Sequence, residues 1–495
     1  MSGGHQVAAG DASTARAAQT LLETGGNAFD AAVAAMFTAM IAEPALTSAG
    51  GGGHLMACPA SGRPVLFDFF VDMPSGPLET ENFFPVQVDF GAAVQEFHIG
   101  SGSAGVPGNL AGLLRVHERL GRAPRREVLA PAIAAARDGV EIHPCQAEII
   151  RLLTPILTNG PDVAGIFAPR GNSLKGGDRI CMPAFASFLE ALADEGPNVF
   201  YQGMAREIEE WSGGRILEAD LRGYSVEERE PIRARFAGHE ILLNPPPAAS
   251  GVLMEFTLSL LDGLAPVLPE DFARAFAATN RAREHHLPAV PSKDGHWLPP
   301  EVRDQLQADF RHGVTTQCNP EPASRGCTTH VSVLDGEGNA ASVTTTNGES
   351  CGSLLPGAGF MMNNMLGEAD LNPGGFHRHP AGSRLPTMMS PLVTVRDGAV
   401  ALVSGSGGSN RIRSALVQVL ARHLANGDTL EAATQAPRLH LEGGVLQAEP
   451  GLEPVEGPWE FKAWPERNVF FGGAHSVAPG AAAGDARRGG CALVG

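Results

Sequence analysis

The sequence predicts an α+β protein in which two stacked antiparallel sheets are covered by helices on the outside. Three observations lead to this fold class: an apolar helical segment at residues 28–41, two hairpin patterns with a period of two in the last third of the chain, and helical patterns on either side of them. The chain has 495 residues, 43% of them hydrophobic and 18% charged, so it is globular and long enough for a sizeable core.

The first clear element is a helix over residues 28–41. Asn27 is a suitable N-cap, and apolar residues fill nearly all sides of the helix, so we expect it to be buried. Four glycines at positions 50–53 follow, and then strand-like runs. Further helices are expected at 110–120, 126–138, 145–154, 184–193, 204–212 and 252–261.

The helical pattern weakens between residues 265 and 326. Prolines recur through this stretch, and the sequence there predicts a linker. It ends directly before Thr328, where an exposed loop would be open to cleavage.

From Thr328 onwards the hydrophobic pattern changes to a period of two. Residues 329–334 and 339–346 read as two strands joined by the turn at 335–338. A second hairpin is expected at 392–395 and 399–403, followed by a glycine-rich turn at 405–409. A helix capped by Asn410 is expected from 411 to 425.

Composition excludes several classes of partner. The formal net charge is −18 and the sequence has no long run of Lys or Arg, so neither nucleic acid nor an anionic membrane is expected to bind. The longest nearly apolar run, 31–41, is too short to cross a bilayer. Seven scattered cysteines without a CxxC pair, and an N-terminus without a signal-peptide pattern, indicate a cytoplasmic protein with reduced thiols.

Two histidine-containing runs could suggest a metal site. Residues 284–286 (Glu-His-His) and 377–379 (His-Arg-His) both lack the HExxH spacing of a zinc-binding helix. We therefore expect neither a metal nor another cofactor.

Thr328 is the residue with the clearest catalytic interpretation. A threonine hydroxyl is a weak nucleophile at neutral pH, but a free α-amine, with an ordinary pKa of about 7.7–8.0, is a suitable base for it. If the chain is cut between Cys327 and Thr328, the new N-terminus carries both groups on one residue. The chain would then be a self-cleaving amide hydrolase.

The alternative for Thr328 is a plain strand start, because β-branched threonine is common there. Three features favour the catalytic interpretation. The preceding segment is rich in proline and glycine, the hairpin would hold Thr328 rigidly, and the run Thr344–Thr346 on the partner strand would offer a second hydroxyl.

The glycine-rich turn at 405–409 has several interpretations. Its backbone N–H groups, next to a helix N-terminus, could hold a phosphate or an oxyanion. It lacks the P-loop pattern and the GxSxG pattern, so nucleotide binding and a serine nucleophile are disfavoured. A tight strand-to-helix connection is equally consistent with it.

Taken together, these motifs resemble the γ-glutamyltransferase family of N-terminal nucleophile (Ntn) hydrolases along nearly the whole chain. The matching stretches are residues 25–33, 49–54, 106–108, 245–251, 328–333, 335 with 338–340, 363–364, 389–391 and 405–411. The resemblance implies a four-layer αββα sandwich. It also implies a precursor that cuts itself between Cys327 and Thr328 into a large subunit, 1–327, and a small subunit, 328–495, which share one core as a heterodimer; a dimer of these heterodimers is an open alternative.

The resemblance also implies roles for individual residues. Thr328 would be the nucleophile, and Thr346 would orient its hydroxyl. The backbone N–H groups of Gly408 and Ser409, next to Gly407, would hold the tetrahedral oxyanion. The acyl group would pass from a small amide to Thr328 and then to water or an acceptor amine.

The residues that grip the amino-acid donor in the family are largely replaced here. Phe70 stands where the family has an arginine for the donor carboxylate, and Thr387 and Met388 stand where it has paired serines. Met365 and Glu368 occupy the positions that bind the α-amino group in the family. The family's asparagine near the second threonine is displaced: Asn347 is adjacent, and a glycine fills the aligned position.

Three hypotheses follow. The first is an amidohydrolase or acyltransferase with an altered donor, such as the glutaryl-type or oxamate-type amides that some members of the family use. The second is a true γ-glutamyl hydrolase or transferase acting on glutathione. The third is an unprocessed pseudoenzyme with a binding role. Besides the residues above, Glu349 and Arg384 are polar candidates for the substrate pocket, which Phe70 and Met365 would make more apolar.

Overall fold

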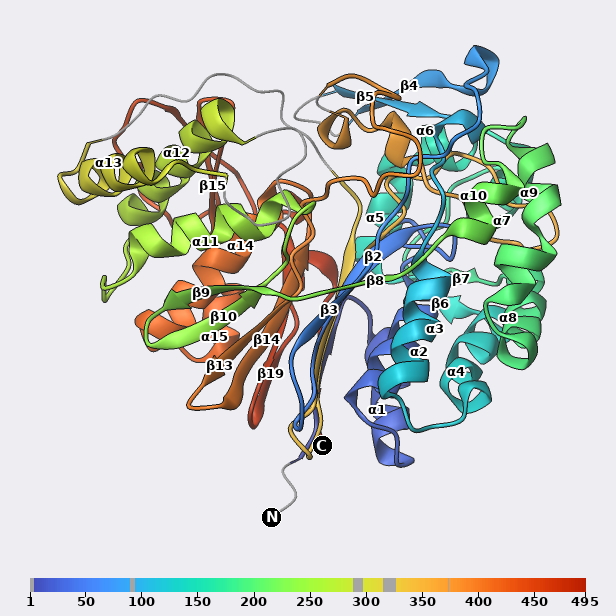
Figure 1. Ribbon diagram of the computed structural model, residues 1–495, viewed down its shortest axis with the longest axis horizontal. Helices are drawn as coiled ribbons and strands as arrows, with labels where there is room; N and C mark the ends of the chain where they lie inside the picture. Colours follow the sequence, from blue (N-terminus) through green and yellow to red (C-terminus); the bar gives the residue numbers. More distant parts are fainter. Residues whose placement is uncertain (1–3, 90–93, 288–296, 315–325, 373) are drawn as a thin grey trace.

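The computed structural model describes residues 4–89, 94–287, 297–314, 326–372 and 374–495. Two antiparallel sheets stack in the middle of the molecule, and helices cover both outer faces (Figure 1). This arrangement is a four-layer αββα sandwich and confirms the predicted fold class.

The first sheet has seven strands in the order β20-β1-β11-β12-β2-β3-β8. Every neighbouring pair in it is antiparallel. Its strands are β1 (Gln6–Ala9), β2 (Gly52–Cys58), β3 (Val65–Phe69), β8 (Glu227–Arg229), β11 (Thr329–Leu334), β12 (Ala340–Thr346) and β20 (Cys491–Val494).

The second sheet has six strands in the order β19-β18-β14-β13-β10-β9, again with antiparallel neighbours. Its strands are β9 (Ile232–Phe236), β10 (His239–Leu243), β13 (Leu392–Arg396), β14 (Ala399–Gly407), β18 (Gly473–Ala478) and β19 (Ala481–Ala483). Both predicted hairpins, β11–β12 and β13–β14, are therefore confirmed.

Side chains alternate between the two faces of β11, as expected of a strand buried on both sides. Val331 and Val333 pack into the core below the first helical layer, whereas Leu334 packs between the sheets. Ser332 also points toward the second sheet, where its hydroxyl donates to the carbonyl of His475. Thr328, two residues before His330, continues this inward-facing series.

The space between the sheets is apolar at one end and polar at the other. At the polar end the ring of His330 is hydrogen-bonded to Thr344 Oγ1 at 2.8 Å and to Ser332 Oγ at 2.9 Å. A Cβ on Gly405 of β14 would come within 2.2 Å of this ring. The glycine therefore lets the second sheet approach the His330 side of β11, directly beside Thr328.

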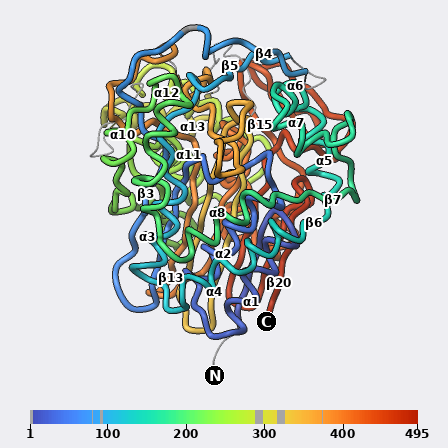
Figure 2. The backbone as a smooth tube through the Cα atoms, turned by 90° about the vertical axis from the view of Figure 1, so that its right-hand side faces the viewer, coloured from blue at the N-terminus to red at the C-terminus, as the bar shows by residue number. Residues whose placement is uncertain are grey.

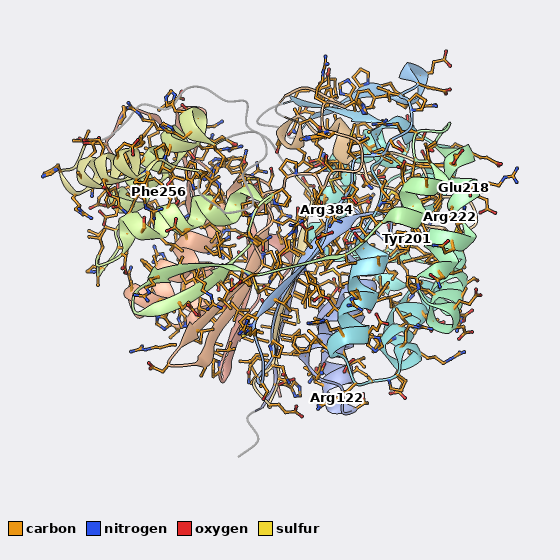
Figure 3. All side chains as sticks on the ribbon, viewed as in Figure 1. Arg122, Tyr201, Glu218, Arg222, Phe256 and Arg384 are labelled. Carbon is orange, nitrogen blue, oxygen red and sulfur yellow. The ribbon has the colours of Figure 1, made fainter. Side chains whose placement is uncertain are left out.

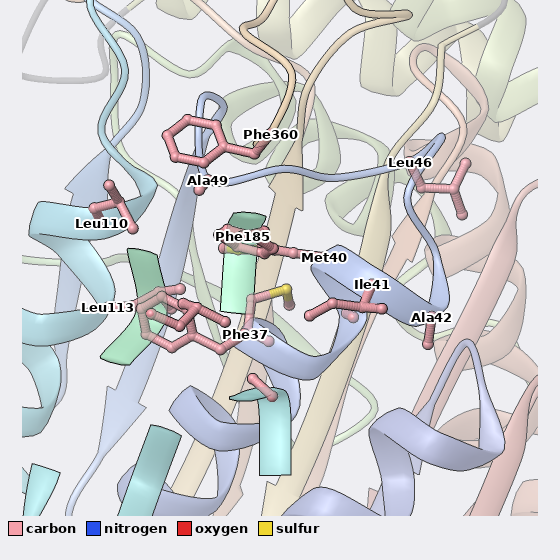
Figure 4. Packing of buried hydrophobic residues seen from close by; sticks show 14 of the residues in the cluster. Phe37, Met40, Ile41, Ala42, Leu46, Ala49, Leu110, Leu113, Phe185 and Phe360 are labelled. Carbon is pink, nitrogen blue, oxygen red and sulfur yellow. The ribbon is translucent and has the colours of Figure 1, made fainter. Parts of the chain in front are cut away.

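The first helical layer is built around α2 (Ala28–Ala42), which is buried along its whole length. Asn27 and Asp30 form a capping box, confirming the predicted start. Phe37, Met40 and Ile41 of α2 pack against side chains from the surrounding helices (Figure 4). The helices that contribute to this core are α1 (Ala12–Glu23), α3 (Asn109–Leu120), α4 (Arg125–Asp138), α5 (Pro144–Leu152), α6 (Thr154–Leu157), α7 (Pro161–Phe167), α8 (Pro183–Glu195), α9 (Ala205–Trp211) and α10 (Glu218–Gly223).

The second helical layer covers the other sheet. Its helices are α11 (Ala249–Leu261), α12 (Pro269–His286), α13 (Pro300–Arg311), α14 (Arg411–Leu420) and α15 (Leu430–Gln435). The linker predicted over 265–326 is therefore wrong for much of its length, because α12 and α13 are helices that contribute to this core. The remainder, 288–296 and 315–325, lies outside the described residues.

Three smaller sheets accompany the two large ones within the described residues. They are β4 (Phe84–Asp89) with β5 (Val94–Ile99), β6 (Val140–Glu141) with β7 (Arg179–Ile180), and β15 (Leu439–Glu442) with β16 (Val445–Ala448) and β17 (Glu460–Ala463). The two ends of the chain meet at one end of the sandwich, where the N–H of Gly495 donates to the carbonyl of His5 (Figure 2). Across the described ranges, no helix combines the length and the hydropathy that a membrane span requires.

Two local predictions around α14 need correction. Gly405 and Gly407 belong to β14, so the turn is confined to Gly408 and Ser409. Asn410 makes no side-chain cap; its amide donates instead to Glu442, and a turn of π-helix (residues 421–425) extends α14.

Candidate active site

Thr328 lies directly before β11 and is only 5% exposed. Its carbonyl oxygen accepts a hydrogen bond from Nη1 of Arg488 at 3.1 Å. On the same side, a Cβ on Gly407 would come within 2.1 Å of this oxygen, so the backbone of β14 lies directly against Thr328. The predicted nucleophile is thus fixed by the end of its strand, by Gly407 and by a guanidinium.

Thr346, at the end of β12, contacts the peptide bond that precedes Thr328. Its hydroxyl donates a hydrogen bond to the carbonyl oxygen of Cys327 and accepts one from the N–H of Gly348 at 3.0 Å. The resemblance implied a bond from Thr346 to the Thr328 hydroxyl. In the uncut chain, the Thr346 hydroxyl instead donates to the carbonyl oxygen of the peptide bond that is proposed to break.

Gly408 and Ser409 form a tight loop between β14 and α14. Both have positive φ, 118° and 49°, and a positive φ is unusual for a serine. Within the described part of the chain, no acceptor is found for the N–H group of either residue. Such a pair of N–H groups next to a helix N-terminus is suited to binding an oxyanion.

A pocket with about 350 Å³ of empty space, which we call the Thr328 pocket, brings most of the predicted site residues together. It is lined by Thr328 and Thr346, by Ser409, and by five of the predicted substrate ligands. Those five are Phe70, Met365, Glu368, Thr387 and Met388. A larger cavity, with about 1510 Å³ of empty space, opens at the other end of β11 beside Leu334 and Asp335 and holds none of these residues.

Phe70 has no exposed surface and stacks on the ring of His54 at 5.9 Å between centroids. His54 in turn contacts Asp68 at 3.3 Å. Phe70 thus gives the pocket an apolar wall, supported from behind by a buried polar network.

Arg384 belongs to that network and not to the Thr328 pocket. Arg384 is labelled in Figure 3. Its guanidinium pairs with Asp68 at 2.8 Å and with Asp72 at 2.5 Å, and lies over the ring of Tyr224 at 5.1 Å. Nη1 also donates to the carbonyl of Asp68, and Nη2 donates to the carbonyl of Ser225. With its donors engaged in this way, the geometry does not support the interpretation of Arg384 as a substrate ligand.

Two predicted ligands, Asn347 and Glu349, do not line the Thr328 pocket. Asn347 is buried and its amide lies 3.5 Å from the carbonyl of Met362. Glu349 lines a second pocket, which shares Gly326 and Cys327 with the Thr328 pocket.

Burial raises the pKa of Glu349 and of Glu368 well above the usual range. The charge of Asp370 adds to the effect on Glu349, and that of Glu349 adds to the effect on Glu368. Burial therefore favours the protonated form of both carboxyl groups.

Sequence reasoning missed two charged residues beside Thr328. Arg488, from the C-terminal tail, is one of them. The other is Glu43, at the end of α2, which accepts hydrogen bonds from Thr14 at 2.9 Å and from Thr329 at 2.5 Å. Burial, with the charge of Asp11, raises the pKa of Glu43 to about 8. A contact over this distance in sequence leaves no periodic signal, so neither residue could have been found from the pattern.

The fold and this constellation define an acyl-amide hydrolase of the Ntn class. The sequence pattern of the Gamma-glutamyltranspeptidase family matches residues 14–456. The chain belongs to this family.

Its relatives carry two kinds of name. It is 32% identical to "Acylase ACY 1 proenzyme" of Pseudomonas sp. (strain V22) over 89% of this chain and 82% of the relative. It is 30% identical to "Glutathione hydrolase proenzyme" of Pseudomonas aeruginosa over 88% of this chain and 83% of the relative. Among solved structures, the cephalosporin acylase from Bacillus halodurans has a TM-score of 0.83 at 21% identity, covering 99% of this chain and 96% of that one; at this identity it bears on the fold alone.

Proposed function

We propose that this chain is a self-cleaving threonine amidohydrolase and acyltransferase whose donor is a small acyl amide without an amino-acid head group. The proposal of self-cleavage rests on the hydrogen bond from Thr346 to the carbonyl of Cys327. A donor at that oxygen polarises the carbonyl for attack by the adjacent Thr328 hydroxyl.

The processing step balances as follows. The Thr328 hydroxyl oxygen bonds to the carbonyl carbon of Cys327, the C–N bond of the peptide breaks, and the nitrogen takes the proton that the hydroxyl loses, becoming the α-amine of Thr328. Water then hydrolyses the ester, leaving a carboxylate on Cys327 and restoring the hydroxyl.

Turnover repeats the same chemistry on a substrate. The α-amine takes the proton of the Thr328 hydroxyl as the oxygen attacks the amide carbonyl, and it returns that proton to the leaving amine. The N–H groups of Gly408 and Ser409 would hold the oxyanion. The acyl ester on Thr328 then passes to water or to an acceptor amine, with no cofactor.

The donor assignment is supported by the Thr328 pocket. Phe70, Met365 and Met388 line it where the family carries charged or polar ligands, and Arg384 is engaged elsewhere. Losing a charged contact of this kind costs about 2–5 kcal/mol. A short uncharged acyl chain suits this lining better than a zwitterionic head group, and a glutaryl chain, which keeps the terminal carboxylate but lacks the α-ammonium group, lies between the two.

A γ-glutamyl donor such as glutathione is the second candidate, because Glu368 lines the pocket and an ionised Glu368 could hold an α-ammonium group. Its raised pKa weakens this alternative, since the neutral carboxyl attracts a cation less strongly. One of the relatives named above also carries the name glutathione hydrolase.

Two measurements test the proposal. On a denaturing gel the purified wild type should give two fragments, with Thr328 first in the smaller one by mass analysis, and Thr328→Ala should give one band. Anilides of glutaryl, short acyl and γ-glutamyl groups should then be compared by kcat/KM. Efficient turnover by an uncut chain would contradict the mechanism, and a strong preference for the γ-glutamyl anilide would contradict the donor assignment.

A further inference from the structure

The side chain of Arg488 reaches Thr328 from the C-terminal tail. It ends the short 3₁₀ turn η8 (Ala486–Arg488) and is only 6% exposed. Its Nη1 atom donates to the carbonyl oxygen of Thr328 at 3.1 Å. This carbonyl is attached to the same Cα as the nitrogen of Thr328. A cut before Thr328 would therefore create an α-amine next to a guanidinium group.

Three glycines make room for the guanidinium group of Arg488. A Cβ on Gly407 would come within 3.0 Å of Nη1, and a Cβ on Gly408 within 3.3 Å of Nη2. A Cβ on Gly473 of β18 would come within 2.5 Å of Arg488 Cδ. The side chain thus packs between Thr328 on one side and the backbone of β14 and β18 on the other.

Arg488 is buried without a carboxylate partner. Across the residues that the structure describes, no carboxylate lies within salt-bridge distance of it, and its Nε atom has no hydrogen-bond partner. The neighbouring Arg487, by contrast, pairs with Glu449 and Asp485. Burial lowers the pKa of Arg488, but a guanidinium group stays charged at neutral pH. A positive charge is therefore held at the carbonyl of Thr328.

Three glutamates near this end of β11 are buried in a way that opposes their ionisation. Burial, with the charge of Asp11, raises the pKa of Glu43 to about 8, so this carboxyl group is mainly protonated at pH 7. Burial also favours the protonated form of Glu349 and Glu368, which follow β12. None of the three thus supplies a full negative charge to offset Arg488.

Two aspartates in the same region are engaged by other groups. Asp370 accepts a hydrogen bond from the hydroxyl of Ser409 at 2.6 Å. Asp485 forms salt bridges with Arg438 at 2.6 Å and with Arg487 at 3.1 Å. Their charges are therefore directed towards partners other than Arg488.

The other ionisable groups around Arg488 add no negative charge. Burial raises the pKa of the thiols of Cys145 and Cys327, so both stay protonated. Burial lowers the pKa of the rings of His330 and His475, so both are uncharged at neutral pH. Arg411 of α14 is a second cation that acts on the same region. The surroundings of Thr328 are therefore electrostatically positive.

The protonation state of the α-amine decides whether turnover can begin. Only the free amine can take the proton of the Thr328 hydroxyl. At an ordinary pKa of about 7.7–8.0, most of an α-amine is protonated at pH 7. A nearby cation disfavours the ammonium form and lowers the pKa of the amine.

We propose that Arg488 is a positioning residue that fixes the carbonyl of Thr328 and, as a cation without a carboxylate partner, keeps the new α-amine in its free, basic form at neutral pH. It would act through Thr328 and not on the substrate. This inference rests on the proposed function, because it requires Thr328 to become an N-terminus.

The test is the pH profile of kcat/KM, measured on matured enzyme with the best substrate of the anilide series. Arg488→Gln keeps a side-chain N–H donor and removes the charge, whereas Arg488→Lys keeps the charge and loses the planar fork. The acid limb of the glutamine variant should move to higher pH by at least about one unit. The lysine variant should keep the limb near its wild-type position.

Arg413→Gln is the matched control for loss of a buried arginine. Arg413 is 8% exposed, donates to Asn280 and does not line the Thr328 pocket. This variant should leave the acid limb unchanged.

A purely structural role for Arg488 predicts a different pattern. Both Arg488 variants would then lose kcat/KM equally at every pH, and the acid limb would stay in place. That result would overturn the inference while leaving the proposed function intact. The same result is expected if the new carboxylate of Cys327 pairs with Arg488 after the cut, so it counts against the inference in either case.

A second measurement needs only the wild type and serves if Arg488→Gln does not fold or mature. Cyanate carbamoylates an α-amine only in its free form, so the pH dependence of this modification, followed by mass analysis of the smaller fragment, gives the pKa of the amine. We expect a midpoint below the ordinary range of about 7.7–8.0. A midpoint within or above that range would overturn the inference. Absence of chain cleavage in the wild type would instead show that the proposed function itself is wrong.

Discussion

The hydroxyl of Thr346 donates a hydrogen bond to the carbonyl oxygen of Cys327, so the end of β12 holds the peptide bond that leads into Thr328. The N–H of Gly348 donates to the same hydroxyl, which fixes its direction. One side chain is thus positioned to act on the carbonyl carbon that the neighbouring threonine would attack.

Replacing Thr346 by valine keeps the shape of the side chain and removes the donor. We expect self-cleavage to slow by about 10²–10³-fold, the usual effect of deleting one donor to a developing oxyanion. Thr346→Ser should restore most of the rate because it retains the hydroxyl. The rate is measured as the appearance of two fragments on a denaturing gel, and a valine variant that matures like the wild type would remove Thr346 from the mechanism.

Gly407→Ala should disable the site with little effect elsewhere. The new Cβ would lie 2.1 Å from the carbonyl oxygen of Thr328, so one of the two backbones must move. A displacement near 1 Å at a reacting group costs about 10²-fold in rate, and we expect at least that loss in kcat. Gly165→Ala is the matched control, since its Cβ meets nothing within 4 Å on helix α7. Activity should be assayed after confirming the folded state by circular dichroism.

Phe70→Arg should shift the donor preference towards γ-glutamyl compounds. The new guanidinium could pair with the α-carboxylate of the donor, and its charge would favour ionisation of Glu368 in the same pocket. The ratio of kcat/KM for γ-glutamyl anilide to that for an uncharged short-acyl anilide is expected to rise about tenfold. Phe70→Met, which keeps an apolar wall, should not change the ratio; an arginine variant with the wild-type ratio would mean that residue 70 does not set specificity.

Glu43→Gln should stabilise the protein at alkaline pH. The pKa of Glu43 is about 8 in the folded chain against an ordinary value of 4.5, so between these values the unfolded chain has lost a proton that the folded chain retains. The free energy of unfolding of the wild type therefore falls as pH rises through this window, by up to about 1.4 kcal/mol per pH unit from this group.

Glutamine mimics the protonated carboxyl and has no such dependence. The stability gap between Glu43→Gln and wild type should therefore be small near pH 5 and grow towards pH 8, as measured by urea denaturation midpoints. Glu23→Gln, an exposed position on α1, serves as the control. A gap that stays constant with pH would show that Glu43 is ionised in the folded protein.

Local patterns were sufficient for the parts of the fold that depend on neighbours in sequence. The buried helix after Asn27 and the hairpin after Thr328 were predicted correctly because their periodicity and capping residues are local. Pro300 was misread as a helix breaker. It stands at the first helical position of α13, where its missing N–H is harmless.

The residues of the candidate site also fall into those that the sequence predicts and those that it cannot predict. The resemblance placed Thr328, Thr346, Phe70 and Ser409 around one pocket, which the structure shows. Arg488 and Arg384 could not be placed, because their partners are 160 and 316 residues away in sequence. Tertiary packing decides which of these two arginines faces the site. The hydrophobic pattern of the sequence gives no information about it.

The strand order of the first sheet has a consequence for the matured protein. A cut before Thr328 would leave β1, β2, β3 and β8 on one fragment and β11, β12 and β20 on the other, so the fragments alternate as β20, then β1, then β11–β12, then β2–β3–β8. Each fragment thus completes the backbone ladder of the other. We infer that nicked protein melts in a single cooperative transition, and that halves produced from separate genes would have to meet as nascent chains before either could fold.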